Sequence, residues 1–82
     1  MERLIGEVTH YFPRIGVAAI SLDDDLNDGD EIEVRGAHSN FTQIVTSMQI
    51  EHRNIATASR GQEIGLRVDK SVQAGDKVFR MD

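Results

Sequence analysis

The chain has 82 residues, of which 39% are hydrophobic and 5% aromatic, and its formal net charge is −5. This length allows one domain with one core, and the absence of cysteine excludes disulfide bridges and thiolate metal sites. An acidic chain is not a general phosphate binder, because extensive contact with nucleic acid requires a basic surface. No apolar run approaches the roughly 20 residues of a membrane span, and the N-terminus carries no secretory signal, so we expect a cytoplasmic protein that does not enter a membrane.

Six short segments alternate apolar and polar residues with a period of two, which is typical of strands that have one buried face. In chain order they are residues 4–10, 17–22, 31–34, 43–50, 63–68 and 77–81. No longer window keeps a helical stripe, and residues 54–60 are expected to form one helical turn at most. The sequence therefore predicts a single all-β domain over residues 1–82.

One turn sequence is used repeatedly, in "LNDGDEIEV" at 26–34 and in "VQAGDKVFR" at 72–80, with a weaker copy at 58–64. Glycine can adopt a positive φ at a tight turn without a Cβ clash, and a neighbouring Asp can accept hydrogen bonds from turn N–H groups. We therefore expect a positive φ at Gly29 or Gly75. Strands entered by such turns favour a small closed antiparallel barrel of about six strands, because closure removes exposed sheet edges.

The order and spacing of these residues resemble the second domain of the translational GTPases, the elongation factor Tu group. The positions that carry the resemblance, within residues 5–79, are Gly16, Gly29, Asp30, Gly36, Ser47, Met48, Ala58, Gly61, Ile64, Gly65, Gly75 and Asp76. The resemblance implies a stand-alone Greek-key β-barrel of the translation-protein type. It also implies a binding module that contacts RNA or a ribonucleoprotein in translation or RNA modification. Similar barrels are appended to collagenase-like peptidases, so a protein-interaction subunit that docks to such an enzyme is the alternative.

Catalytic and metal sites are not indicated by the sequence. No Gly-x-x-x-x-Gly-Lys-Ser/Thr loop is present, so we expect no binding of GTP. Within the acidic stretch, Leu26 and Arg35 stand where a calcium loop needs oxygen ligands. The only histidines lack the spacing of a helical zinc site: His10, His38 and His52. We therefore expect a protein that is not an enzyme and that uses no cofactor and no metal.

Two short stretches are the candidate binding surface. The first joins the aromatic residues Tyr11 and Phe12 to Arg14, across a proline that cannot continue a strand ladder. Such groups stack on bases or fill a pocket on a protein partner, although Phe12 could instead plug one end of the barrel. The second stretch follows the Ser-Met pair, on the side that lies near the tRNA acceptor end in the translation factors. Its candidate residues are Gln49, His52 and Arg53, which could also be ordinary outward strand residues.

Overall fold

The computed structural model describes residues 1–82 and contains ten strands, no helix, and thus no helix that could cross a membrane. The all-β class predicted from the alternation is therefore confirmed. The strands are β1 (Glu2–Phe12), β2 (Val17–Leu22), β3 (Leu26–Asn27), β4 (Glu31–Arg35), β5 (Asn40–Ile44), β6 (Met48–Ile50), β7 (Arg53–Ile55), β8 (Thr57–Ala58), β9 (Glu63–Arg67) and β10 (Lys77–Met81).

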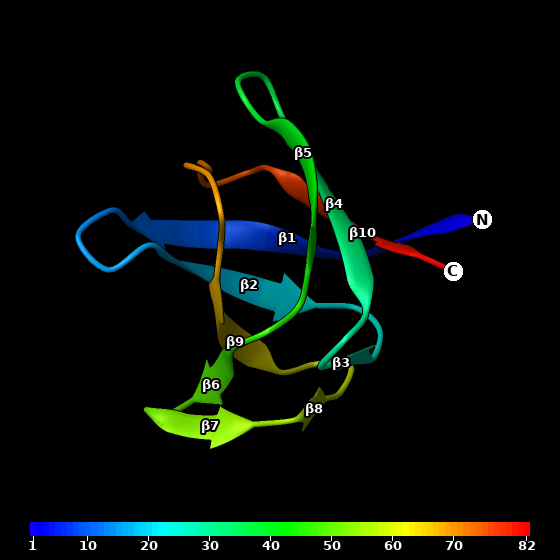
Figure 1. Ribbon diagram of the computed structural model, residues 1–82, viewed down its shortest axis with the longest axis vertical. Helices are drawn as coiled ribbons and strands as arrows, with labels where there is room; N and C mark the ends of the chain where they lie inside the picture. Colours follow the sequence, from blue (N-terminus) through cyan, green and yellow to red (C-terminus); the bar gives the residue numbers. More distant parts are fainter.

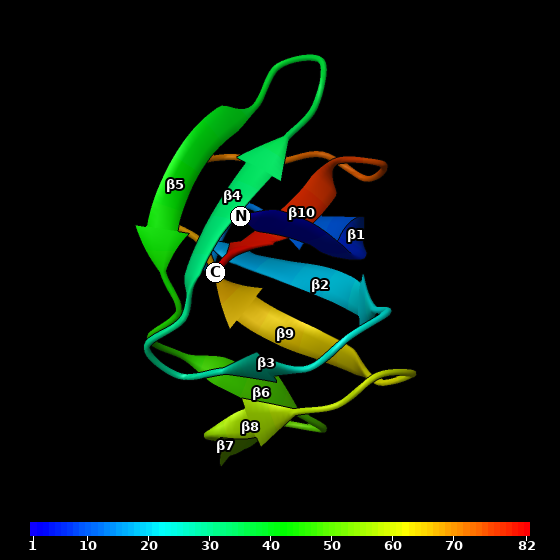
Figure 2. The same cartoon turned by 90° about the vertical axis from the view of Figure 1, so that its right-hand side faces the viewer.

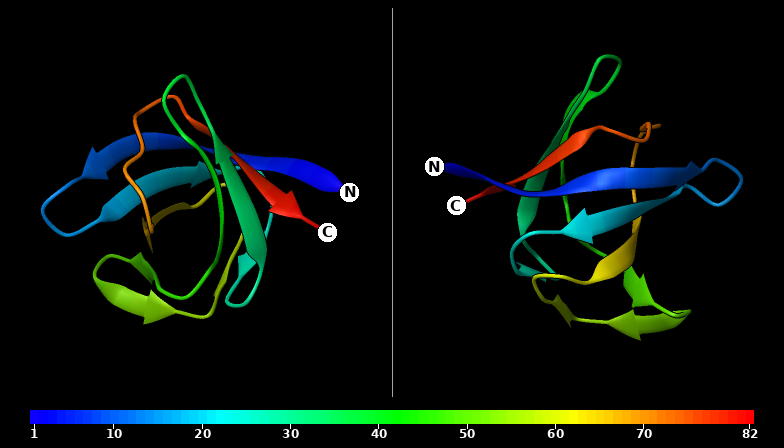
Figure 3. Two further views of the ribbon diagram at one scale, coloured as in Figure 1. Left: turned by 45° about the horizontal axis from the view of Figure 1, so that its top comes forward. Right: turned by 180° about the vertical axis from the view of Figure 1, so that it is seen from behind.

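Eight strands form one antiparallel sheet in the order β5-β4-β10-β1-β2-β9-β6-β7, and β3 pairs with β8 separately. Figures 1 and 2 show that the sheet curls, and that the β3–β8 pair lies beside β6 and β7 at one end of the molecule. Seventeen buried hydrophobic residues form one core cluster inside the curl. The two termini lie side by side, away from the tip of the β1–β2 hairpin (Figure 3), and the Met1 amino group donates a hydrogen bond to the Asp82 carbonyl.

The predicted closed barrel of about six strands is wrong. The sheet is open, because β5 and β7 are its two edges and do not pair with each other. The segment 43–50, expected to be one strand, is divided into β5 and β6. Between them Val45 is buried, its N–H donates to the Asp30 carbonyl and its carbonyl accepts from the Gly29 N–H, over 2.8 Å each. The helical turn expected at 54–60 is also wrong, since β7 and β8 occupy this stretch.

A side chain takes the place of the missing strand partner at the β5 edge. Gln43 is only 6% exposed. Its Nε2 donates to the Arg67 carbonyl over 2.9 Å, and its Oε1 accepts from the Asp69 N–H over 2.8 Å. One buried amide thus connects β5 to the last residue of β9 and to the segment that follows, without a strand ladder, and its own polar atoms are satisfied.

The repeated sequence forms the same turn three times, at residues 27–30, 59–62 and 73–76. In each turn the third residue is glycine with a positive φ, of 90°, 89° and 97° in chain order, so the prediction for Gly29 and Gly75 is confirmed. The side chain of the fourth residue accepts from the N–H of the first over 2.9, 2.7 and 3.0 Å. Each glycine N–H also donates to the carbonyl of a buried residue elsewhere, in chain order Val45, Leu22 and Val8. The repeat is therefore architecture that anchors one segment to another.

Candidate functional site

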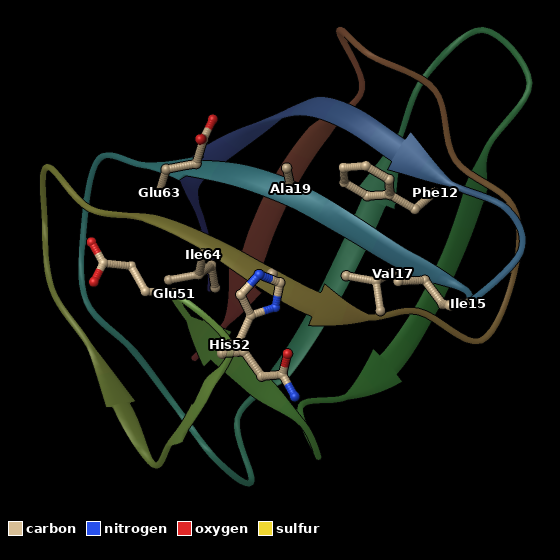
Figure 4. Close-up of a pocket in the computed structure, with 10 residues that line it drawn as sticks. Phe12, Ile15, Val17, Ala19, Glu51, His52, Glu63 and Ile64 are labelled. Atoms are coloured by element: carbon tan, nitrogen blue, oxygen red, sulfur yellow. The ribbon is translucent and has the colours of Figure 1, made fainter.

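An open groove of about 410 Å³ lies on the outer face of the sheet, over β2 and β9 (Figure 4). Along both strands the residues alternate between the core and the outer face, so that Ala19 and Gly65 lie between fully buried neighbours. These two residues pair directly across the strands. Because one has only a methyl group and the other has no side chain, the surface between the strands is low, and it forms the floor of the groove.

The apolar end of the groove is built by the β1–β2 hairpin. Phe12 closes β1 and is 45% exposed, and Ile15 in the hairpin loop is 60% exposed. The Phe12 carbonyl accepts from the N–H groups of Ile15 and Gly16, over 3.3 and 2.9 Å. The Phe12 ring meets the His10 imidazole edge-on at 4.4 Å between centroids. The hairpin therefore holds two large apolar side chains in water beside Val17 on β2.

The polar end of the groove is built by the β6–β7 turn. Ile50 and Arg53 pair across this hairpin, so Glu51 and His52 form a two-residue loop. Both loop residues have a positive φ, of 50° and 65°. A turn with two such residues normally contains Asn-Gly or a similar pair, and L side chains pay about 1–3 kcal/mol of strain for these conformations. The side chains of both residues line the groove (Figure 4).

The two ends of the groove differ in charge. Of its ten lining residues none is Lys or Arg, whereas Glu51 and Glu63 are both acidic. Glu63 accepts a hydrogen bond from the Thr9 hydroxyl over 2.8 Å. Figure 4 shows the two carboxylates at one end, Phe12 and Ile15 at the other, and the imidazole ring between them. This arrangement disfavours a phosphate at the acidic end and favours a cation there.

The groove gathers three of the six candidate residues, Phe12, Gln49 and His52. Phe12 lies outside the core cluster, so the alternative in which it plugs a barrel end is wrong. Tyr11 instead packs against the core. The guanidinium groups of Arg14 and Arg53 lie on exposed positions outside the groove lining.

Sequence reasoning missed the floor, the remaining apolar residues and the acidic residues of the groove. They are Ile15, Val17, Ala19, Glu51, Glu63, Ile64 and Gly65. The alternation itself could have placed residues 17, 19, 63 and 65 on one outer face. The alternation does not show that β2 pairs with β9, because this pairing joins two segments that are far apart in the sequence.

Several charged groups outside the groove form ion pairs within the chain. Arg35 donates to Glu33 over 2.6 Å and to Glu2, and its guanidinium lies 4.3 Å from the centroid of the Phe79 ring. These hydrogen bonds raise the pKa of Arg35 above its ordinary value. Asp24 in the acidic stretch pairs with Arg3 over 2.6 Å. No three His, Asp or Glu side chains are grouped to hold a metal ion, so the groove is the best candidate site.

The chain matches no family model, but it is similar to proteases. It is 34% identical to an uncharacterized protease of Methanocaldococcus jannaschii over 76 residues, which is 92% of this chain. It is 32% identical to a collagenase of Porphyromonas gingivalis over 80 residues, which is 95% of this chain. The chain spans only 19% and 22% of the lengths of these two relatives.

Two solved structures share its fold. One is the selenomethionine variant of the C-terminal domain of a putative U32 peptidase from Geobacillus thermoleovorans, with a TM-score of 0.89 and 24% identity, covering 96% of this chain and 99% of that chain. The other is the same domain without selenomethionine, with a TM-score of 0.89, 23% identity and coverage of 96% and 92%.

These comparisons correct the expected relationship to the translational GTPases. The relatives are proteases, and nothing among them supports a role in translation, an elongation-factor identity or RNA binding. The resemblance misled because several of the residues that carry it, such as Gly29, Gly61 and Gly75, only form turns. Turn residues of this kind indicate the fold of a chain, but they do not indicate which partner it binds. The chain therefore has the fold of a U32 peptidase C-terminal domain, and it corresponds to about a fifth of the proteases that it resembles.

Proposed function

We propose that the chain is a non-catalytic docking domain that works with a peptidase of the U32 kind. The observation that carries this proposal is the coverage. The chain accounts for 99% of a C-terminal domain of a putative U32 peptidase, yet for only 19–22% of the whole relatives. This coverage supports a role as an accessory part of such a protein.

The lining of the groove supports a binding role over a catalytic one. It contains no Ser, Thr or Cys that could serve as a nucleophile beside His52. It does contain exposed apolar side chains, and Phe12 is an aromatic residue of the kind that anchors protein interfaces. A protein partner therefore suits this surface better than a nucleic acid, whose phosphates Glu51 and Glu63 would repel.

The test is association with the catalytic part of a U32 peptidase from the same genome, expressed without its own C-terminal domain. We expect the 82-residue chain to bind that part in sedimentation and calorimetry, with little dependence on salt because apolar contacts contribute most. We also expect the chain alone to leave gelatin and casein intact. Hydrolysis by the isolated chain, or salt-sensitive binding to RNA in place of the peptidase, would contradict the proposal.

A further inference from the structure

We propose that the groove over β2 and β9 binds an extended segment of a protein partner that presents an apolar side chain at one end and a lysine or arginine at the other. This inference rests on the proposed docking function and adds the surface and the chemistry of the bound segment. It follows from the exposure of the hairpin, the charge of the groove, its length and the strain of one turn.

The apolar end offers a surface that water does not favour. Phe12 and Ile15 are 45% and 60% exposed, in a chain with few other large exposed hydrophobic residues. They lie together at one end of the groove (Figure 4). An apolar side chain placed between them would remove both from water, which is the main favourable contribution in such contacts.

The acidic end offers two carboxylates that have no cationic partner within the chain. The ion pairs of the molecule use other carboxylates, those of Glu2, Glu7, Asp24, Glu33 and Asp82. Glu63 receives only the Thr9 hydroxyl, and an ionised carboxylate can accept several further hydrogen bonds. A lysine or arginine from a partner would therefore find free acceptors at Glu51 and Glu63.

The length of the groove fixes the spacing between the two partner side chains. Along β9, Arg67 lies opposite Val17 at the apolar end, and Glu63 lies opposite Ser21 at the acidic end. Four residues of strand span about 13 Å. In an extended segment, side chains four positions apart share one face and are separated by the same distance. The exposed Arg67 also disfavours a cation at the apolar end, so charge sets the orientation of the segment.

The strained turn is an independent observation that points to the same surface. Glu51 and His52 both hold a positive φ, and both side chains line the groove. Asn-Gly would relax this hairpin but would remove the carboxylate and the imidazole. Strain that is kept at a surface with unpaired acceptors supports a binding role for the two side chains.

The test is a titration of the isotope-labelled chain, followed by NMR, with a capped nine-residue peptide that has leucine and lysine four positions apart among serines. Both orders of leucine and lysine are used. We expect chemical-shift changes at residues 15–19, 49–52 and 63–65. Replacing the lysine by glutamate, or changing Glu51→Gln together with Glu63→Gln, should weaken binding about five- to tenfold. A peptide that shifts other residues, or none at millimolar concentration, would overturn the proposal, as would an oligonucleotide that occupies the groove.

A matched pair of variants separates this proposal from the docking function. Ala19→Arg fills the floor of the groove, whereas Thr42→Arg adds the same side chain at an exposed position on β5, away from the groove. We expect both to fold by their melting curves, and only Ala19→Arg to lose the peptide and the catalytic part of the peptidase. If Ala19→Arg still binds that catalytic part as tightly as Thr42→Arg, the groove proposal fails and the docking function stands. If the unmodified chain does not bind the catalytic part at all, the docking function itself fails.

Discussion

Residues with a positive φ in this molecule are of two kinds: four glycines, Gly16 in the β1–β2 hairpin among them, and the pair Glu51 and His52. At residues 27–30, 59–62 and 73–76 the positive φ falls on glycine, which adopts it without a Cβ clash. At the β6–β7 hairpin it falls on Glu51 and His52, which do not. In the glycine turns the glycine N–H donates to the carbonyl of a buried residue. In the Glu51–His52 turn the two side chains line the groove. The three repeated turns, in which residue type and conformation agree, belong to the scaffold, whereas Glu51 and His52, in which they disagree, lie at the candidate site.

The largest expected change in the free energy of unfolding tests whether the glycine turns are rigid. Asp76 ends the third turn and is 4% exposed, and a Cβ on Gly36 would lie 1.8 Å from its Oδ1. We expect Gly36→Ala to lower the free energy of unfolding by about 3 kcal/mol, because a buried carboxylate that already accepts from Gln73 cannot move freely. Urea unfolding measures the loss.

The control for this prediction removes the Asp76 carboxylate, which a methyl group at position 36 would meet. In a chain that carries Asp76→Ala, the additional change Gly36→Ala should cost far less than it does alone, since the two residues share one space. Additive losses in the double variant would mean that the turn yields to the new methyl group.

The second effect compares two glycines that differ in φ. Gly75 has a φ of 97° with open space around its Cβ position, whereas a Cβ on Gly65 would lie 3.4 Å from Val17 Cγ1, an ordinary contact. We expect Gly75→Ala to cost about 1–2 kcal/mol, purely from the backbone conformation. Gly65→Ala should cost less than half of that, because alanine is accepted in a strand. Thermal melting of both variants checks the order, and equal losses would refute the assignment of the cost to φ.

The parts of the fold that could be predicted from the sequence are those set by neighbouring residues. Alternation predicted the places of β1, β2, β4, β9 and β10, and the Gly-Asp pairs predicted turns with a positive φ. It did not predict the short strands β3, β7 and β8 or the division of residues 43–50 into β5 and β6. The open sheet depends instead on Gln43, whose side chain reaches residues 67 and 69 far along the chain. No local pattern indicates that an amide, and not a strand, completes this edge.

The candidate site was less predictable for the same reason. Phe12, Gln49 and His52 were identified by residue type, but the groove that joins them depends on the register between β2 and β9 and between β6 and β9. The strained turn was missed because Glu51 and His52 break the rule by which such turns are recognised. A sequence method that searches for turn residues will overlook a turn that has been given other side chains.

The third variant is expected to be more stable than the unmodified chain, in contrast to the first two. We expect Glu51→Asn combined with His52→Gly to raise the free energy of unfolding by about 1 kcal/mol, because Asn and Gly adopt a positive φ with little strain. The same variant should bind the leucine–lysine peptide more weakly. As a control, Arg53→Gly changes the next residue, which lies in β7 without a positive φ, and should lower the stability. A double variant that melts below the unmodified chain would show that Glu51 and His52 are not strained.

The smallest expected change in stability distinguishes the cost of a strained backbone from the contribution of a surface ion pair. The hydrogen bond from Arg35 holds the pKa of the exposed Glu2 carboxyl below its ordinary value of 4.5. A carboxyl with a lowered pKa in the folded state stabilises the protein above its unfolded pKa, and this contribution disappears as the pH falls through the folded value. Glu2→Gln should therefore lower the melting temperature slightly at pH 7 and in low salt, and the difference should shrink in acid and in high salt. The loss in Gly75→Ala should persist in high salt, because a cost set by φ is not screened. A salt-sensitive loss in Gly75→Ala would remove the distinction between the glycine turns and the charged surface.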